Sequence, residues 1–140
     1  MSQTDDTLRR ILKETTVIAL VGWSANPARP SHGVASYLAR RGYRVIPVNP
    51  GLAGRLTSWG ETVRATLSDI AEQVDMVDIF RNPDAVGPVV DQALTALPGV
   101  KTIWMQLGVV NEAAAAKARA AGLDVVMDRC PAIEIPRLLG

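Results

Sequence analysis

The stretch VIALVGWSANPARPSHGVASYLARRGYRVIPV, residues 17–48, determines the fold that we predict for this chain of 140 residues. Residues 17–21 form a continuous apolar run, as in a strand buried on both faces. Residues 31–41 carry apolar side chains at helical spacing, and Gly42 follows as a stop signal. Residues 43–48 form a second apolar run. A strand, a helix and a second strand in this order indicate one unit of a parallel α/β sheet.

The remaining sequence repeats this alternation of strand and helix. The further strands are predicted at residues 74–80, 102–107 and 123–127, and the further helices at residues 5–14, 84–97 and 112–121. The less regular segments are a long excursion over residues 49–67, one helical turn over 68–72 and a tail of undefined form over 133–139. We therefore predict an α/β fold in one domain over residues 1–140. It is a Rossmann-like, doubly wound parallel sheet of about five strands with helices on both faces.

The composition excludes several classes of protein. Fifteen basic and 14 acidic residues give a formal net charge of +1, so no electrostatic footprint for nucleic acid or a membrane surface is expected. The single cysteine, Cys130, cannot form an internal disulfide, which fits a reducing compartment. The N-terminal segment is too charged for a signal peptide, and no apolar run reaches the roughly 20 residues of a membrane span. We expect a cytoplasmic protein whose protein partners and oligomeric state the sequence does not specify.

A ligand is expected at the loops that follow the strands, because α/β sheets bind ligands outside the carboxyl ends of their strands. The first of these loops, residues 22–30, leads into a helix whose free backbone N–H groups favour an anion. Arg29 would add a charge-assisted hydrogen bond to a phosphate. For Ser31 considered alone, helix capping is favoured over a ligand contact. The position of the loop after the first strand favours phosphate binding by the loop as a whole.

The end of the second predicted strand tests which nucleotide fits. A site for NAD needs an acidic residue there for the ribose hydroxyls, and a G-x-G-x-x-G turn after the first strand. Residues 45–50, VIPVNP, place Asn49 and two prolines at that position, and the loop that begins at Gly22 lacks the glycine pattern. Both absences argue against an NAD(P)-dependent oxidoreductase, which we keep as the alternative from another functional class.

Five motifs resemble the single-domain coenzyme A-binding proteins, which are similar to the coenzyme A-binding domain of the succinyl-CoA synthetase alpha subunit. The motifs are VGWSANPARPSHGV (21–34), GYRVIPVNPGLAG (42–54), VDMVDIFRNPDAV (74–86), WMQLGVVNEAAA (104–115) and VVMDRCPAIE (125–134). They cover nearly the whole chain and occur in the order of the family. The resemblance implies a Rossmann-like domain that binds coenzyme A or an acyl-CoA.

The resemblance also implies which residues contact the coenzyme. The start of the helix at residues 30–32 would meet the phosphates, and residues 47–54 would border the nucleotide. Residues 80–83 would lie along the adenosine or the pantetheine, and residues 105–108 would also lie near the coenzyme. The candidate coenzyme-binding residues are Gly22, Ser24, Arg29, Pro30, Ser31, His32, Asn49, Pro50, Arg81, Gln106 and Gly108, with Cys130 as a candidate contact of the coenzyme thiol. We assign no catalytic residue and no metal ligand.

The chain departs from the synthetase pattern in three ways. Leu52 stands where that pattern has a lysine, so Arg29 or Arg55 would have to contact the phosphate instead. Trp23 is bulkier than the small residue expected after Gly22. The synthetases also need a phosphohistidine domain and an ATP-grasp partner, for which 140 residues leave no room. We therefore expect binding without acyl-CoA ligase activity. A regulatory interaction domain that has lost its ligand is the third alternative, and Leu52 favours it.

Cys130 follows the last predicted strand, at the edge of the sheet where the ligand loops gather. One hypothesis is a mixed disulfide with the coenzyme thiol. The other is a buried, unreactive cysteine, which we favour because cysteine is among the most buried residue types.

Asp75 and Asp78 suggest an acid/base or magnesium site, because two carboxylates lie close together in the sequence. They are three residues apart on the predicted strand 74–80, which puts them on opposite faces. The loop after the first strand also lacks the acidic cluster of a phospho-receiver domain. We expect no catalysis by this pair.

Overall fold

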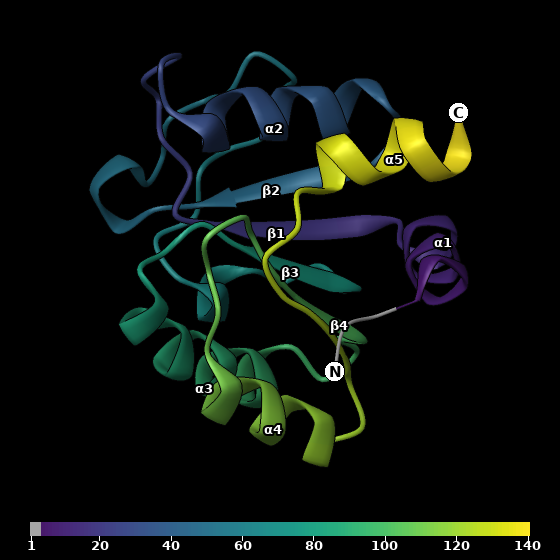
Figure 1. Ribbon diagram of the computed structural model, residues 1–140. Helices are drawn as coiled ribbons and strands as arrows, with labels where there is room; N and C mark the ends of the chain where they lie inside the picture. Colours follow the sequence, from purple (N-terminus) through teal and green to yellow (C-terminus); the bar gives the residue numbers. More distant parts are fainter. Residues whose placement is uncertain (1–3) are drawn as a thin grey trace.

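Five parallel strands build one sheet in the computed structural model, which describes residues 4–140 (Figure 1). The strands are β1 (Val17–Val21), β2 (Arg44–Val48), β3 (Met76–Ile79), β4 (Thr102–Met105) and β5 (Asp124–Val126). Their order in the sheet is β2-β1-β3-β4-β5, and every pairing is parallel. The predicted Rossmann-like, doubly wound α/β fold is therefore confirmed.

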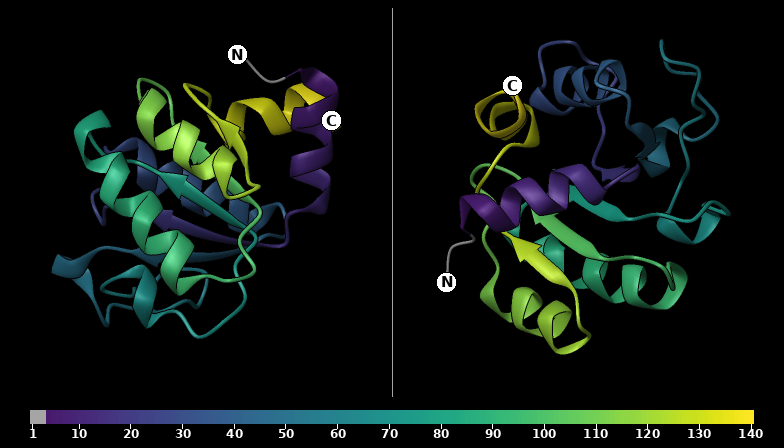
Figure 2. Two further views of the ribbon diagram at one scale, coloured as in Figure 1. Left: turned by 90° about the horizontal axis from the view of Figure 1, so that it is seen from below. Right: turned by 90° about the vertical axis from the view of Figure 1, so that its right-hand side faces the viewer.

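Helices cover both faces of this sheet (Figures 1 and 2). They are α1 (Asp5–Glu14), α2 (Pro30–Arg40), α3 (Val86–Ala96), α4 (Glu112–Ala120) and α5 (Pro131–Leu139). In Figure 1, α2 and α5 lie on one face and α3 and α4 on the other, while α1 lies at the end where the strands begin. The two helical layers leave the carboxyl ends of the strands open.

The core has two parts because successive side chains of a strand point to opposite faces. Val77 and Ile103 are fully buried in the part that includes α3 and α4. Leu20 and Trp104 are fully buried in the part that includes α1, α2 and α5. Each fully buried aliphatic side chain contributes about 1.5–3 kcal/mol. A strand buried on both faces must be apolar at nearly every position, which explains the sequence VIALV of β1.

The C-terminal segment is helical. The sequence left the form of residues 133–139 open, and the structure places them in helix α5, which begins at Pro131, directly after Cys130. A proline is tolerated in the first turn of a helix because its missing N–H would have no partner there. Pro136 also lies within α5, and a proline at this position interrupts the sequence pattern that is typical of a helix. Cys130 is therefore the N-cap residue of α5.

The strands β3 and β4 are shorter than predicted. β3 begins only at Met76, and the carboxylate of the preceding Asp75 accepts hydrogen bonds of 2.9 Å from the backbone N–H groups of Thr16 and Val17. Asp75 thus lies before the strand and joins the start of β1 to it. The inference that Asp75 and Asp78 occupy opposite faces of one strand no longer applies. β4 ends at Met105, where a turn begins.

Residues 49–75 carry the chain from β2 across β1 to β3. This segment contains the short helical turns η1 (Pro50–Leu52) and η2 (Leu67–Asp69), so the turn expected over residues 68–72 lies slightly earlier. Arg64 forms two hydrogen bonds with Glu72, of 3.0 and 3.1 Å. These bonds are the main cause that lowers the pKa of Glu72 to about 2. The long excursion is therefore held in place by charged side chains.

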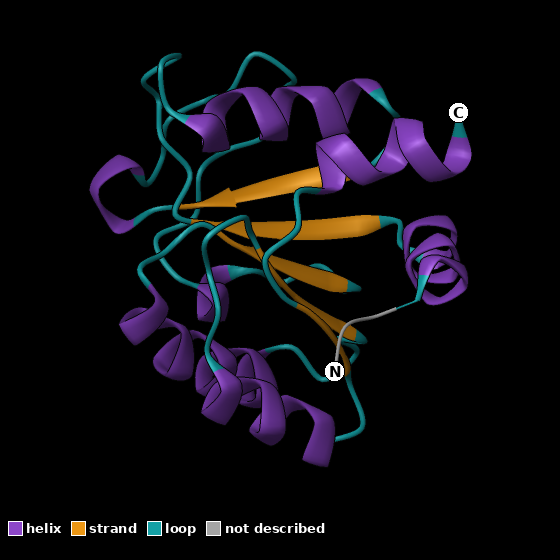
Figure 3. Ribbon diagram, viewed as in Figure 1, coloured by secondary structure: helices purple, strands orange, loops and turns teal. Residues whose placement is uncertain are grey.

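Figure 3 shows that loops gather where the strands end. They include the loop between β1 and α2, the excursion after β2, and the segment after β3 that contains η3 (Pro83–Ala85). Within residues 4–140, none of the helices has the length and apolar character needed to cross a bilayer. The open carboxyl ends of the strands are the position at which such α/β sheets bind their ligands.

Candidate ligand-binding cleft

The ends of β1 and β3 lie side by side, although β2 separates these strands in the sequence. After β1 the chain turns to α2 on one face, and after β3 it turns to α3 on the other. The segments that follow β1 and β3 therefore diverge and leave a crevice at the point where the strand order reverses. This is the usual position of a ligand in such sheets. Gly22 follows β1 with φ of +88°, a conformation that side-chain-bearing residues rarely adopt.

A cleft of about 620 Å³, here called the main cleft, opens at this crevice. Eight of the eleven candidate ligand residues line it: Gly22, Ser24, Arg29, Pro30, Ser31, Asn49, Arg81 and Gln106. Cys130 lines it as well. The volume suits a small-molecule ligand. Residues predicted from separate loops of the sequence therefore meet around one space.

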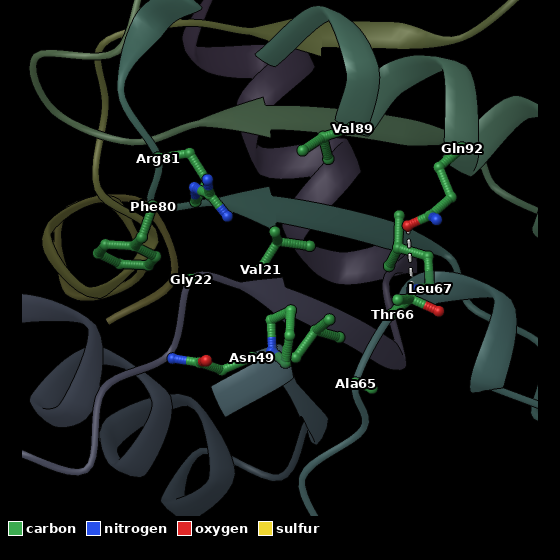
Figure 4. A pocket seen from close by; sticks show the side chains of 12 residues that line it. Val21, Gly22, Asn49, Ala65, Thr66, Leu67, Phe80, Arg81, Val89 and Gln92 are labelled. Atoms are coloured by element: carbon green, nitrogen blue, oxygen red, sulfur yellow. Dashed lines mark hydrogen bonds between the residues drawn. The ribbon is translucent and has the colours of Figure 1, made fainter. Parts of the chain in front are cut away.

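A second cleft, here called the side cleft, has a volume of about 350 Å³ (Figure 4). It shares four lining residues with the main cleft: Gly22, Asn49, Phe80 and Arg81. Pro50, the ninth candidate, lines this cleft together with Thr66, Leu67, Val89 and Gln92. Figure 4 shows the Arg81 side chain extending toward Val21. Because the clefts meet at shared residues, they offer room for an elongated ligand.

The charge of both clefts favours an anion. Arg29 and Arg81 line the main cleft, and no Asp or Glu among residues 4–140 lines either cleft. Neither arginine has an ion-pair partner within the described chain, whereas Arg44, Arg64 and Arg137 are all paired with carboxylates. Two unpaired guanidinium groups beside a cleft without acidic side chains favour a phosphate-bearing ligand.

The loop between β1 and α2 is fixed by its own hydrogen bonds. The buried Ser31 hydroxyl accepts a hydrogen bond of 3.0 Å from the backbone N–H of Ser24. Helix α2 begins at Pro30, and its N-cap residue is Arg29, whose side chain makes no capping bond. The expectation that Ser31 caps the helix is therefore wrong: Ser31 lies inside the first turn and shapes the loop instead.

Two of the candidate residues, His32 and Gly108, line neither cleft. The His32 ring stacks on the Trp23 ring with centroids 5.7 Å apart, and its Nδ1 lies 3.1 Å from the carbonyl oxygen of Ser24. With that acceptor, Nδ1 carries the proton. Gly108 donates its backbone N–H to the carboxylate of Asp128 at 2.7 Å. Both residues hold the loops that form the main cleft.

Asn49 uses both atoms of its side-chain amide. Its Nδ2 donates to the carbonyl oxygen of Trp23 at 2.7 Å, and its Oδ1 accepts from the backbone N–H of Gly51 at 2.9 Å. The residue therefore ties the loop after β1 to the loop after β2. Its amide oxygen is already occupied where an NAD site would place an acid for the ribose hydroxyls.

Two buried polar atoms in the wall of the main cleft have no hydrogen-bond partner among residues 4–140. They are Nε1 of Trp23 and Oε1 of Gln106, in residues only 4% and 5% exposed. A buried donor or acceptor without a partner costs about 1–3 kcal/mol. The pair offers one donor and one acceptor to a ligand, and an amide group is complementary to both.

Cys130 is buried, as expected, but it also lines the main cleft from the N-cap of α5. The neighbouring Arg129 carbonyl accepts a hydrogen bond of 2.8 Å from Nε1 of Trp104. The Arg129 side chain pairs with the buried carboxylate of Glu134 at 2.7 Å, and Arg137 pairs with the same carboxylate. Burial alone would raise the pKa of Glu134, but these two arginines hold it below its usual range. The start of α5 is thus anchored on both sides of Cys130.

Asp78 is the most unusual titratable residue of the fold. It lies in β3 between Leu20 and Trp104, and neither carboxylate oxygen has a partner among residues 4–140. Complete burial raises the pKa of Asp78 well above its usual range. No group of three or more His, Cys, Asp or Glu side chains in the described residues could hold a metal ion.

Comparison with known proteins identifies the family to which this Rossmann-like chain belongs. The family described as CoA binding domain matches residues 16–136, so the chain belongs to the CoA-binding domain family. The uncharacterized protein YneT of Bacillus subtilis (strain 168) is 33% identical over 123 residues, which cover 88% of this chain and 87% of YneT. A hypothetical protein from Pyrococcus horikoshii OT3 has 38% identity and a TM-score of 0.90, with 99% of this chain and 94% of that chain covered.

A longer enzyme contains a similar domain. The dinucleotide-forming acetyl-coenzyme A synthetase 1 of Ca. Korarchaeum cryptofilum, in complex with phosphate and ADP, has 26% identity and a TM-score of 0.68. The match covers 87% of this chain but only 27% of the synthetase. The present chain thus corresponds to one part of that enzyme.

Proposed function

We propose that this protein binds coenzyme A, or an acyl-CoA, across the main and side clefts, and that it has no acyl-CoA ligase activity of its own. The observation that carries the proposal is the chemistry of the main cleft. Arg29 and Arg81, which have no ion-pair partner among residues 4–140, would contact phosphates, and the atoms of Trp23 and Gln106 that lack a partner there would contact an amide. Coenzyme A carries both kinds of group, and membership of the CoA-binding domain family supports the same ligand.

The ligand would lie along the ends of β1 and β3. Its phosphates would lie near Arg29, Arg81 and the N-terminus of α2, where free backbone N–H groups favour anions. Its adenosine would occupy the side cleft, which offers the apolar side chains of Val21, Leu67 and Val89. Its pantetheine arm would occupy the main cleft and run toward Cys130.

The position of His32 supports binding without ligase chemistry. The resemblance to the synthetases implies that their ligase reaction uses a phosphorylated histidine. His32 is the only histidine of this chain, and its ring stacks on Trp23 and lines neither cleft. It is therefore proposed to shape the loop and not to react with the ligand.

Two observations bear on the alternatives. The side-chain amide of Asn49 is already used by Trp23 and Gly51, which argues against an NAD(P) site at the end of β2. Leu52 packs against the core that includes α2, so the position of the synthetase lysine is filled by a structural side chain. Of the two arginines that could replace that lysine, Arg29 lines the main cleft and Arg55 lines neither cleft.

A thermal-shift panel of coenzyme A, acetyl-CoA, NAD, NADP and ATP tests the proposal. A ligand that binds only the folded state stabilises it by about 2.7 kcal/mol at 100 times its Kd. We expect the melting temperature to rise with coenzyme A or acetyl-CoA and to change least with NAD. A rise with NAD or NADP and none with the coenzymes would favour the oxidoreductase alternative, and no rise at all would favour a domain that has lost its ligand. Turnover of a carboxylic acid, ATP and coenzyme A would contradict the second half of the proposal.

A further inference from the structure

We propose that Cys130 exchanges with coenzyme A disulfide to form a reversible mixed disulfide with coenzyme A, so that the main cleft holds the coenzyme covalently when coenzyme A disulfides are present. This modification presupposes the proposed function, because the same cleft would present the coenzyme sulfur. It goes beyond that function, since a binding protein needs no reactive cysteine.

The placement of Cys130 is the first observation. It is the only cysteine of the chain, it is 6% exposed, and it lines the main cleft. The Trp104 indole and the Glu134 carboxylate hold Arg129 immediately before it. Cys130 therefore has a fixed position in the wall of the cleft, while most of its surface is covered by protein.

The second, independent observation concerns Nε1 of Trp23 and Oε1 of Gln106, which have no hydrogen-bond partner in the part of the chain that the structure describes. Both residues are more than nine-tenths buried, and both line the same cleft as Cys130. The pantetheine arm carries two amide groups followed by a short chain that ends in the thiol. If the amides of the arm contact Trp23 and Gln106, the short chain that follows them carries the thiol toward Cys130, which lines the same cleft. Leu107 and Val109 line the cleft as apolar contacts for its methylene groups.

The chemistry is thiol–disulfide exchange. The thiolate of Cys130 attacks one sulfur of coenzyme A disulfide and forms a new S–S bond. The original S–S bond breaks, and its electron pair leaves with the second coenzyme A as a thiolate, which takes a proton from water. The proton of Cys130 passes to water before the attack. One disulfide is consumed and one is formed, and a reducing thiol such as dithiothreitol reverses the reaction.

Selectivity follows from the burial of Cys130. A cysteine that is only 6% exposed reacts slowly with disulfides that do not fit the cleft. A disulfide that carries the coenzyme binds first and then reacts at a high effective concentration. We therefore expect coenzyme A disulfide to react at least about tenfold faster than glutathione disulfide at equal concentration.

Intact-mass spectrometry of the full chain tests the proposal. The protein is incubated with coenzyme A disulfide or with glutathione disulfide and measured without a reducing agent. We expect one adduct with the mass of coenzyme A less two hydrogens, its loss on addition of dithiothreitol, and no adduct on Cys130→Ser. The melting temperature of Cys130→Ser without ligand serves as the check that this variant is folded. If that variant is unstable, blocking of the wild-type adduct by excess coenzyme A thioether provides the second test.

The outcomes separate this inference from the proposed function. A thermal shift with coenzyme A together with no adduct, or with equal rates for both disulfides, would overturn the inference and leave the proposed function intact. A coenzyme-selective adduct on Cys130 would support the inference. An adduct that forms equally with both disulfides, in a protein that shows no thermal shift, would overturn both.

Discussion

A β-carbon at position 22 would lie 2.2 Å from the carbonyl oxygen of Phe80, and this proximity between Gly22 and Phe80 defines the site. The contact joins the end of β1 to the end of β3. After these two neighbouring strands the chain turns to opposite faces of the sheet. Real β-carbons essentially never approach an oxygen this closely, so only glycine fits. Both residues line the main cleft and the side cleft.

Replacement of Gly22 by alanine is expected to destabilise the fold and to abolish ligand binding. Gly22 has φ of +88°, and the new methyl group would clash with the Phe80 carbonyl. We expect a loss of about 2–4 kcal/mol in the free energy of unfolding, measured by urea denaturation. Gly33→Ala is the matched control, because Gly33 lies in α2 with nothing within 4 Å of an added β-carbon. It should stabilise the protein by about 0.5–1 kcal/mol. Equal effects of the two substitutions would contradict this explanation.

Replacement of Glu134 by glutamine is expected to loosen the start of α5. The pKa of Glu134 is held below its usual range by Arg137 and Arg129 against the effect of burial. The folded state therefore gains stability above the usual pKa of a glutamate and loses it as the pH falls through the lower folded value. We expect Glu134→Gln to cost about 1–3 kcal/mol at pH 7, less than a fully buried pair because both arginines are partly exposed.

The control for this prediction is Glu14→Gln, which removes an exposed carboxylate 3.6 Å from Arg10. Its effect should stay within about 0.5 kcal/mol. If Glu134→Gln were equally mild in urea denaturation, the ion pairs would not be what positions Cys130.

Replacement of Asp78 by asparagine is expected to stabilise the protein at alkaline pH. Because burial raises the pKa of Asp78 in the folded state, the folded state binds its proton more tightly than the unfolded state. Stability from this group is therefore lost as the pH rises from about 4 toward the folded value. The stabilisation by Asp78→Asn should be larger at pH 8 than at pH 5 by at least about 1 kcal/mol.

Thermal unfolding across pH 5–8 measures this difference. The exposed carboxyl of Asp84 provides the comparison, since Asp84→Asn should change stability by less than about 0.5 kcal/mol at every pH. A constant effect of Asp78→Asn from pH 5 to 8 would show that Asp78 does not titrate differently in the folded state.

Replacement of Gln106 by methionine separates ligand binding from folding. The substitution keeps the volume of the side chain and removes the Oε1 atom that has no partner within the described chain. We expect the unliganded protein to be as stable as wild type or more stable, because an unsatisfied buried acceptor is lost. The affinity for coenzyme A should fall by about 2- to 12-fold, as for one neutral hydrogen bond. Unchanged affinity in a calorimetric titration would mean that Gln106 does not contact the ligand.

Much of the fold was predictable because its signals are local. The apolar run of β1 and the helical spacing of α2 both lie within short segments, and the structure confirms the strand and the helix that they predict. Helix α5 was not predicted, because Pro131 and Pro136 interrupt the pattern that marks a helix. The strand ends were also misplaced, since β3 and β4 are shorter than the apolar runs that predict them.

The site was predictable to the extent that it follows the strand ends. Sequence pattern and family resemblance together named eight coenzyme-binding candidates that line the main cleft, and Cys130 as well. They missed Val34 and Val109, whose spacing indicates only core packing, and Leu67 and Gln92 of the side cleft, which come from distant segments. Trp23 looked out of place in the loop, but its ring is buried, stacks on His32 and meets Trp59 edge to face. The large side chain of Trp23 is therefore explained by its tertiary contacts, which the sequence alone does not show.

A calorimetric titration of coenzyme A tests the central claim most directly. We expect saturable binding by the wild type and a loss of at least about tenfold in affinity for each of Arg29→Ala and Arg81→Ala. Lys101 lies at the other end of the sheet, where the strands begin, so Lys101→Ala should bind coenzyme A as the wild type does. No binding of coenzyme A, or affinity that neither arginine substitution changes, would contradict the proposal that the coenzyme phosphates lie in the main cleft.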